Sequence, residues 1–138
     1  MAKTEIRSGQ FLDGSLVDAD VSDSAAIKLT KSENVVTGLT DQATITTDAS
    51  AGTIFTVTLA GNRTLAAPTN PVDGMKRIWR FKQDATGSRT ITLNAVFRLG
   101  TDITTITLTT TASKTDYVGA IYNGTDAKWD IVAFIKGL

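Results

Sequence analysis

From residue 43 onward, apolar and polar residues alternate in short runs, which is the period-two pattern of half-buried β-strands. The clearest run covers residues 53–59, where Phe55, Val57 and Leu59 share one face. Gly, Asn, Asp or Pro occupies nearly every break between runs, as expected for turns. The pattern predicts strands at residues 43–48, 53–59, 63–67, 75–82, 89–95, 103–110, 117–122 and 129–135, after a short strand or turn at 34–40.

The turns between these runs predict the fold class. Asn123-Gly124-Thr125-Asp126 separates the last two runs and is a strong hairpin signal. Short strands with regular turns predict an all-β fold, specifically an antiparallel β-sandwich or jelly-roll-like domain of about eight strands. We therefore expect a β-sandwich domain over residues 43–138, preceded by an extended N-terminal arm over residues 1–42.

Large apolar residues supply the predicted core. In the run 75–82, Trp79 lies on one face while Lys76, Arg80 and Lys82 lie on the other, because successive strand residues point in opposite directions. We expect two sheets packed face to face, so that both inner faces contribute to one core. The predicted core residues are Phe55, Trp79, Phe81, Leu93 and Trp129.

The N-terminal arm has a different apolar pattern. Its apolar residues recur about every five positions, which fits neither the helix period of 3.6 nor the strand period of 2. One interpretation is an arm that docks on a neighbouring protein, and the alternatives are a polar leader or a short pentapeptide-type coil. Residues 24–32 also permit a short helix. The predicted docking residues are Ile6, Phe11, Leu16, Val21 and Ile27.

The amino-acid composition limits the kinds of chemistry that the chain can perform. The 138-residue chain contains no Cys and no His, which excludes disulfides, thiol chemistry and histidine catalysis or metal ligation. Its 14 basic and 14 acidic residues balance, which argues against a general nucleic-acid binder. No apolar run approaches the roughly 20 residues of a membrane helix, and the first residues lack a signal-peptide core. We expect a protein that is made in the cytosol, stays soluble or joins an assembly there, and needs no cofactor and no membrane.

The acidic residues offer weak alternatives to a structural role. Asp18, Asp20 and Asp23 cluster as in an oxygen-ligand loop, but the further ligands and glycine of a calcium loop are absent, so a solvated acidic loop is the competing interpretation. A glycosidase needs a carboxylate pair, but most acids of residues 43–138 lie at predicted turns. The sequence therefore predicts no catalytic residues.

Two sets of motifs resemble proteins of tailed-bacteriophage virions. The first set resembles a segment of phage fibre proteins and comprises residues 6–16, Asp20-Val21 and Ala25-Ala26-Ile27. The second set resembles a small β-domain of phage tail and head fibres. It comprises residues 62–65, Pro68, Asp73-Gly74, residues 83–89, residues 97–100, residues 114–117, Tyr122-Asn123 and Trp129-Asp130.

The resemblance implies a virion structural protein without enzyme activity. Since the chain is short and lacks shaft repeats, we expect a capsid decoration or head-fibre protein that docks through its arm on the major capsid protein or another virion protein. The alternative is a receptor- or carbohydrate-binding module of a tail fibre. The resemblance also implies a homotrimer located in the virion.

Overall fold

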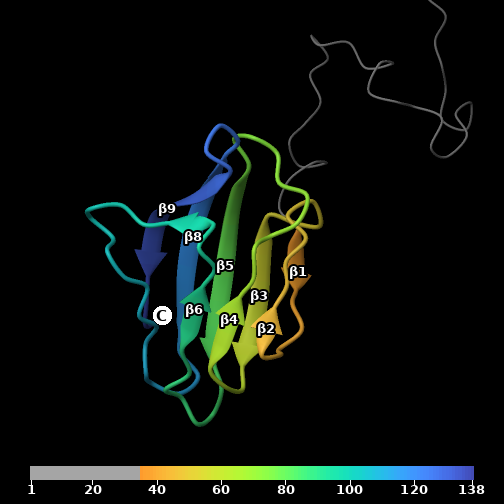
Figure 1. Cartoon of the computed structure of the whole chain (residues 1–138). Coiled ribbons are helices and arrows are strands. Elements are labelled where there is room, and N and C mark those ends of the chain that lie inside the picture. The colour runs from red at the N-terminus through yellow and green to blue at the C-terminus, as the bar shows by residue number, and fades with distance from the viewer. Residues whose placement is uncertain (1–34) are drawn as a thin grey trace, which may run out of the picture. The chain divides into compact units, whose positions relative to one another are not determined.

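The computed structural model describes residues 35–138, and the predictions for the arm anchors, the short helix and the acidic cluster lie outside them. The described part contains nine β-strands in two sheets and no helix (Figure 1). Sheet A has the strand order β1-β3-β5-β8-β9-β7, and sheet B has the order β2-β4-β6. The expected all-β fold is therefore confirmed.

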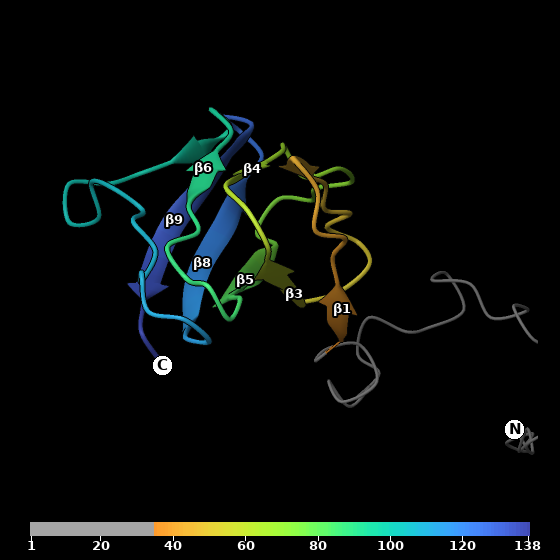
Figure 2. The ribbon, with the colours of Figure 1, turned by 90° about the horizontal axis from the view of Figure 1, so that it is seen from below.

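The first six strands form a coil in which the chain visits sheet A and sheet B alternately. The strands of the three successive turns are β1 (Val36–Gly38) and β2 (Thr44–Ile45), β3 (Ile54–Leu59) and β4 (Arg63–Leu65), and β5 (Lys76–Gln83) and β6 (Ile91–Leu93). Each strand pairs in parallel with the equivalent strand of the next turn. Seen from below, the two sheets lie on opposite sides of the core (Figure 2).

Parallel stacking places like residues on like residues along the coil. Ile45 of β2 aligns with Leu65 of β4, which aligns with Leu93 of β6. Phe55 of β3 aligns with Trp79 of β5, and their ring centroids lie 5.9 Å apart. Apolar and aromatic side chains suit such ladders because they pack well on a pleated surface. The coil is thus held by columns of side chains as well as by backbone hydrogen bonds.

The remaining strands complete sheet A in a different way. β8 (Thr115–Asn123) pairs antiparallel with β5 and with β9 (Lys128–Ile135), and a bulge interrupts the second pairing between Gly119 and Ala120. β7 (Phe97–Arg98) joins the edge by parallel pairing with β9. The predicted hairpin around residues 123–126 is therefore present, and it covers the β5 edge of the coil.

Two features of the predicted fold are wrong. The sheets are not antiparallel, because sheet B is parallel and sheet A is mixed. The alternation of apolar and polar residues predicts which face of a sheet a residue occupies. It does not predict whether the neighbouring strand runs parallel or antiparallel. The predicted strand at 103–110 is also absent, although Leu108 is buried. Its backbone bonds elsewhere: the Asp116 carboxylate accepts from Thr109 N at 2.7 Å, and Thr110 O accepts from Ser88 N at 2.9 Å.

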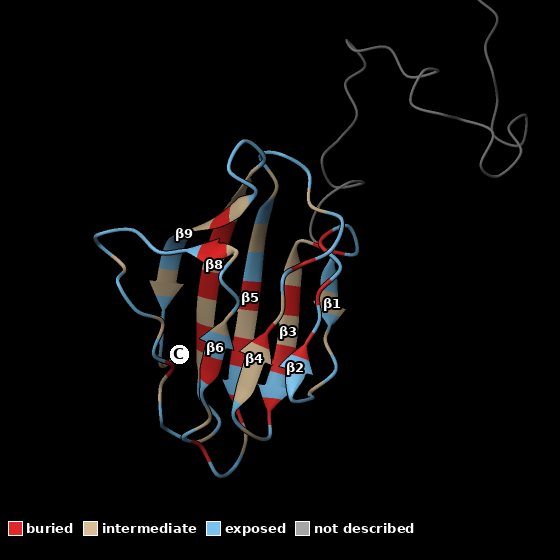
Figure 3. Cartoon of the chain, viewed as in Figure 1, coloured by how far each residue is buried: buried red, intermediate tan, exposed pale blue. Residues whose placement is uncertain are grey.

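Burial follows the alternation along β3 and β5 (Figure 3). In the centre of sheet A, Phe55, Trp79, Phe81 and Trp129 are at most 1% exposed, whereas Leu93 is partly buried at the margin of the core. The Trp79 ring packs edge-on against the Trp129 ring, with centroids 5.6 Å apart.

Polar groups inside this core have partners. The Trp79 indole N–H donates to the Thr47 hydroxyl at 3.1 Å. The Gln83 amide donates to Arg89 O and accepts from Arg89 N. Among residues 35–138, no buried side-chain nitrogen or oxygen lacks a hydrogen-bond partner. The inner face of sheet A is therefore fully used by the fold.

β1 lies within residues 1–42 and pairs with β3 as part of sheet A. The division of the chain into an arm over 1–42 and a β-domain over 43–138 stays a prediction.

Candidate functional site

The outer face of sheet A is the strongest candidate surface, because sheet B packs only against the inner face. On β5, the outer residues Lys76, Ile78 and Lys82 are exposed and Arg80 is half-buried, while Trp79 between them is buried. The predicted separation of the basic residues from the aromatic residues of this strand is thus present in the structure.

Six polar residues form an ordered array on this face, which we call the outer-face grid. Thr56, Arg80 and Tyr117 align across β3, β5 and β8 in one row, and the neighbouring row repeats this pattern two residues along. The grid surrounds a shallow hollow of about 310 Å³. Its members are Thr56, Thr58, Arg80, Lys82, Thr115 and Tyr117.

The two cations of the grid have no carboxylate partner among the described residues. Arg80 Nε donates to the Thr56 hydroxyl at 3.2 Å, which orients the guanidinium along the sheet. The acidic residues nearest to Arg80 and Lys82 in the sheet have other partners or lie on the other face. Asp84 binds Arg89 and the N–H groups of its own turn, and Asp116 is buried on the opposite face of β8. Positive charge at the grid is therefore not neutralised by a neighbouring acid.

Other arginines of the described chain contrast with Arg80. Arg63, Arg89 and Arg98 each form an ion pair with an aspartate, at 2.7–2.8 Å. The hydrogen bond from Arg63 lowers the pKa of Asp41, and those from Arg89 and Arg98 lower the pKa of Asp84 and of Asp130. These four ion pairs, two of them from Arg98, tie loops and strand ends together, which is a structural use of arginine.

An apolar hollow adjoins the grid on the same face. Its volume is about 320 Å³, and Tyr117 lines both hollows. Ile135 and Leu138 at its rim are 56% and 64% exposed. A surface of this kind marks a contact with another molecule when it forms a contiguous patch. Besides Tyr117, the lining residues are Ile78, Gly119, Ala133, Ile135 and Leu138.

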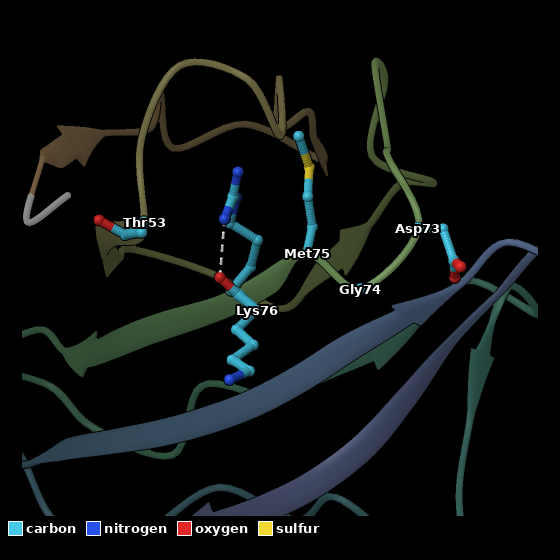
Figure 4. Close-up of a pocket in the computed structure, with 6 residues that line it drawn as sticks. Thr53, Asp73, Gly74, Met75 and Lys76 are labelled. Carbon is cyan, nitrogen blue, oxygen red and sulfur yellow. Dashed lines mark hydrogen bonds between the residues drawn. The ribbon is translucent and has the colours of Figure 1, made fainter. Parts of the chain in front are cut away.

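A larger cleft of about 440 Å³ lies where β5 begins, next to the loop that carries Asp73 and Gly74 (Figure 4). Most of its polar groups bind the protein itself. Asp73 accepts from Gly124 N at 2.8 Å, and Gly74 N donates to Tyr122 O at 2.9 Å. Arg77 Nε donates to Ala49 O at 2.7 Å. These hydrogen bonds fasten the β4–β5 connection to its neighbours, and we assign the cleft no ligand.

Within 35–138, no group of three or more acidic, Cys or His side chains is placed to hold a metal ion. No helix in this part of the chain is long and apolar enough to cross a membrane.

Comparison with protein families identifies the chain. Residues 40–127 match the family described as "Putative phage tail fibre C-terminal domain". The chain belongs to this family. The match covers strands β2 to β8, which include the grid-bearing strands β3, β5 and β8, and it extends to the hairpin turn; β1 and β9 lie outside it. No curated protein and no solved structure matches the chain.

The tail fibre family accounts for the type of protein. A tail fibre domain is a structural part of the phage virion and associates with other virion proteins. The predicted relationship to virion β-domains of tailed phages is therefore confirmed. The family supports the fibre alternative better than the capsid decoration or head-fibre interpretation.

The structure brings together residues that sequence reasoning had left apart in this tail fibre domain. Thr56, Thr58, Thr115 and Tyr117 were not predicted as site residues, since nothing local marks them. The available signal was their alternation with buried residues, which places each on an outer face. Grouping these four residues into one site also requires knowing that β3 and β8 lie beside β5. The proposed docking residues Ile6, Phe11, Leu16, Val21 and Ile27 lie outside the described residues.

Proposed function

We propose that this chain is the binding module of a phage tail fibre and recognises carbohydrate on the host surface through the outer-face grid. The carrying observation is an array of hydroxyl, guanidinium and ammonium groups on a hydrogen-bonded sheet whose other face packs in the core. Binding sites built on strands hold their side chains more accurately than sites on loops.

The grid offers what sugar recognition requires. Threonine and tyrosine hydroxyls both donate and accept, so they match the sugar hydroxyl groups, while Arg80 and Lys82 donate only. A shallow, open hollow suits a polymer that extends beyond the site. The absence of Cys and His fits a binding role better than a catalytic one, and we include no enzyme activity in the proposal.

Host-cell binding tests this function. Labelled full-length protein should bind host cells saturably and should compete with adsorption of the phage. Cells stripped of surface polysaccharide should bind much less protein. Undiminished binding to stripped cells would reject carbohydrate as the receptor, and no saturable binding to intact cells would reject the function.

We also propose that the module works as a homotrimer in which the apolar hollow contacts a second copy of the chain. Ile135→Asp places a charge in the hollow and should reduce the mass in solution from three chains to one. Val72→Asp is the matched control, since Val72 is 60% exposed but lies on the loop before β5. Light scattering after size exclusion measures the mass. A monomeric wild-type protein would contradict the proposal.

Docking through the arm remains a second prediction about assembly. Replacing Ile6, Phe11, Leu16, Val21 and Ile27 by Ser in the full chain removes the apolar anchors but leaves the β-domain unchanged. If the arm docks on the major capsid protein, this variant should lose binding to undecorated capsids. If it docks on another virion protein, capsid binding is absent in both forms and fibre incorporation is lost.

A further inference from the structure

We infer that the outer-face grid takes a negatively charged saccharide, one that carries phosphate or carboxylate groups. This inference rests on the proposed carbohydrate-binding function and adds the charge of the ligand. Nothing in the binding function itself requires that charge. It follows from how the two cations of the grid are placed.

The two cations form one positive site. Arg80 and Lys82 lie two residues apart on the same face of β5, which puts their Cα atoms about 6.5–7 Å apart. They therefore repel each other, and no acidic side chain of the described chain lies within ion-pairing distance of either. Elsewhere the same chain pairs Arg63, Arg89 and Arg98 with aspartates. Leaving Arg80 and Lys82 without such partners keeps them available for an anion.

The position of the cations favours direct contact. Arg80 is half-buried and its Nε donates to the Thr56 hydroxyl, so its guanidinium is oriented before a ligand arrives. Hydrogen bonds between a guanidinium and a carboxylate or phosphate are about twice as strong as neutral ones. Pre-orientation lowers the entropy lost on binding. One anionic group bound between Arg80 and Lys82 would satisfy both.

The rest of the grid indicates a sugar as the carrier of that charge. Thr56 and Tyr117 flank Arg80, and Thr58 and Thr115 flank Lys82, so each cation stands between hydroxyl groups of the two neighbouring strands. Three strands at about 4.8 Å spacing give a row roughly 10 Å wide. A nucleic acid would need several aromatic faces for base stacking. Tyr117 is the single aromatic residue among the grid residues.

Calorimetry on the full-length protein tests the charge requirement. Carboxylate is probed with trigalacturonate against its methyl ester, and phosphate with glucose 6-phosphate against glucose. We expect at least one charged probe to bind at least about tenfold more tightly than its neutral partner, because a charged hydrogen bond contributes more than one factor of ten. Binding should weaken as NaCl rises from about 20 to about 300 mM. The preferred pair identifies the anionic group.

Substitutions locate the site. Arg80→Ala/Lys82→Ala should lower the affinity for the charged probe at least about tenfold. Lys76→Ala removes a charge from the outer face of β5 outside the grid and should leave the affinity unchanged. Circular dichroism of each variant checks that the fold is intact. Lys82→Arg keeps the charge and should retain most of the binding.

The outcomes separate this inference from the function on which it rests. Equal binding of charged and neutral probes, no binding of either charged probe, or equal binding of a single-stranded oligonucleotide would overturn the inference. If Arg80→Ala/Lys82→Ala still adsorbs to host cells like the wild type, the inference fails and the proposed function stands. If the wild type does not adsorb to host cells, the proposed function fails as well.

Discussion

The two faces of strand β5 show how one segment serves two purposes. On the inner face, Trp79 and Phe81 are buried, and the Trp79 ring packs against the Phe55 and Trp129 rings. The indole N–H of Trp79 donates to the Thr47 hydroxyl. On the outer face, Arg80 and Lys82 point away from the core and have no carboxylate partner among the described residues. The same backbone ladders hold both faces in position.

The difference lies in how completely each face is satisfied. A buried polar group without a partner destabilises the fold, so the inner face tolerates none. An exposed cation is solvated by water and costs little to leave without a partner. The outer face is therefore free to carry groups that bind another molecule. Substitutions on the inner face should change stability, and those on the outer face should change binding.

The largest expected effect is on the inner face. Trp79→Ala should lower the free energy of unfolding by about 3–5 kcal/mol, because it leaves a cavity among Phe55, Phe97 and Trp129. Lys76→Ala on the outer face should change it by less than about 0.5 kcal/mol. Urea denaturation followed by tryptophan fluorescence or circular dichroism measures both. Similar losses at the two positions would contradict the division between the faces.

Two threonines provide a closer comparison. Thr47→Val keeps the shape of the side chain but removes the acceptor of the Trp79 indole N–H, and should cost about 1–3 kcal/mol. Thr58→Val makes the same change on the exposed grid and should cost less than about 0.5 kcal/mol. The denaturation midpoints of the two variants check this. Equal costs would mean that the buried hydrogen bond contributes nothing specific.

Lowering the pH should weaken the ion pairs between arginines and aspartates and so reduce stability. The grid contains no such pair and should contribute nothing to this loss. The paired arginines lower the folded-state pKa of Asp41, Asp84 and Asp130, so these carboxylates stabilise the protein above the ordinary aspartate pKa of about 3.9. That contribution is lost as the pH falls through the lowered folded pKa. Since the pairs are near the surface, the loss is modest.

Urea midpoints at about pH 6 and about pH 3 measure this loss. Arg80→Ala/Lys82→Ala should show the same decline as the wild type, because no carboxylate partner faces these cations. A smaller decline in this variant would reveal an acid paired with the grid.

A small stability effect is also expected when both cations of the grid are removed. Arg80→Ala/Lys82→Ala at neutral pH should change the free energy of unfolding by less than about 0.5 kcal/mol per residue, since both side chains lie on the outer face. Removing repulsion between the two cations offsets the loss of the Arg80–Thr56 hydrogen bond. Denaturation of the same preparation used for calorimetry makes the comparison direct. A large destabilisation would make the grid a structural element.

The local alternation of apolar and polar residues predicted the positions of many of the strands. The alternation in residues 53–59 and 75–82 corresponds to β3 and β5, and the turn at residues 123–126 joins β8 to β9. It failed at residues 103–110, where Ile106 and Leu108 alternate with threonines like a strand but the backbone bonds to a side chain and a loop. A strand exists only where a neighbour completes its ladder, and the segment itself does not contain that information.

The sequence by itself determined the period-two alternation, the turn positions and the identity of the residues on each face. These are local properties, since they depend on side-chain direction along one strand and on the conformations that Gly, Asn, Asp and Pro allow. The tertiary structure alone decided that β1 to β6 form a parallel coil and that β3 and β8 flank β5. Strand pairing joins residues 24 to 37 positions apart at the grid, for example Thr56 to Arg80 and Arg80 to Tyr117. The grid therefore exists only in the folded sheet.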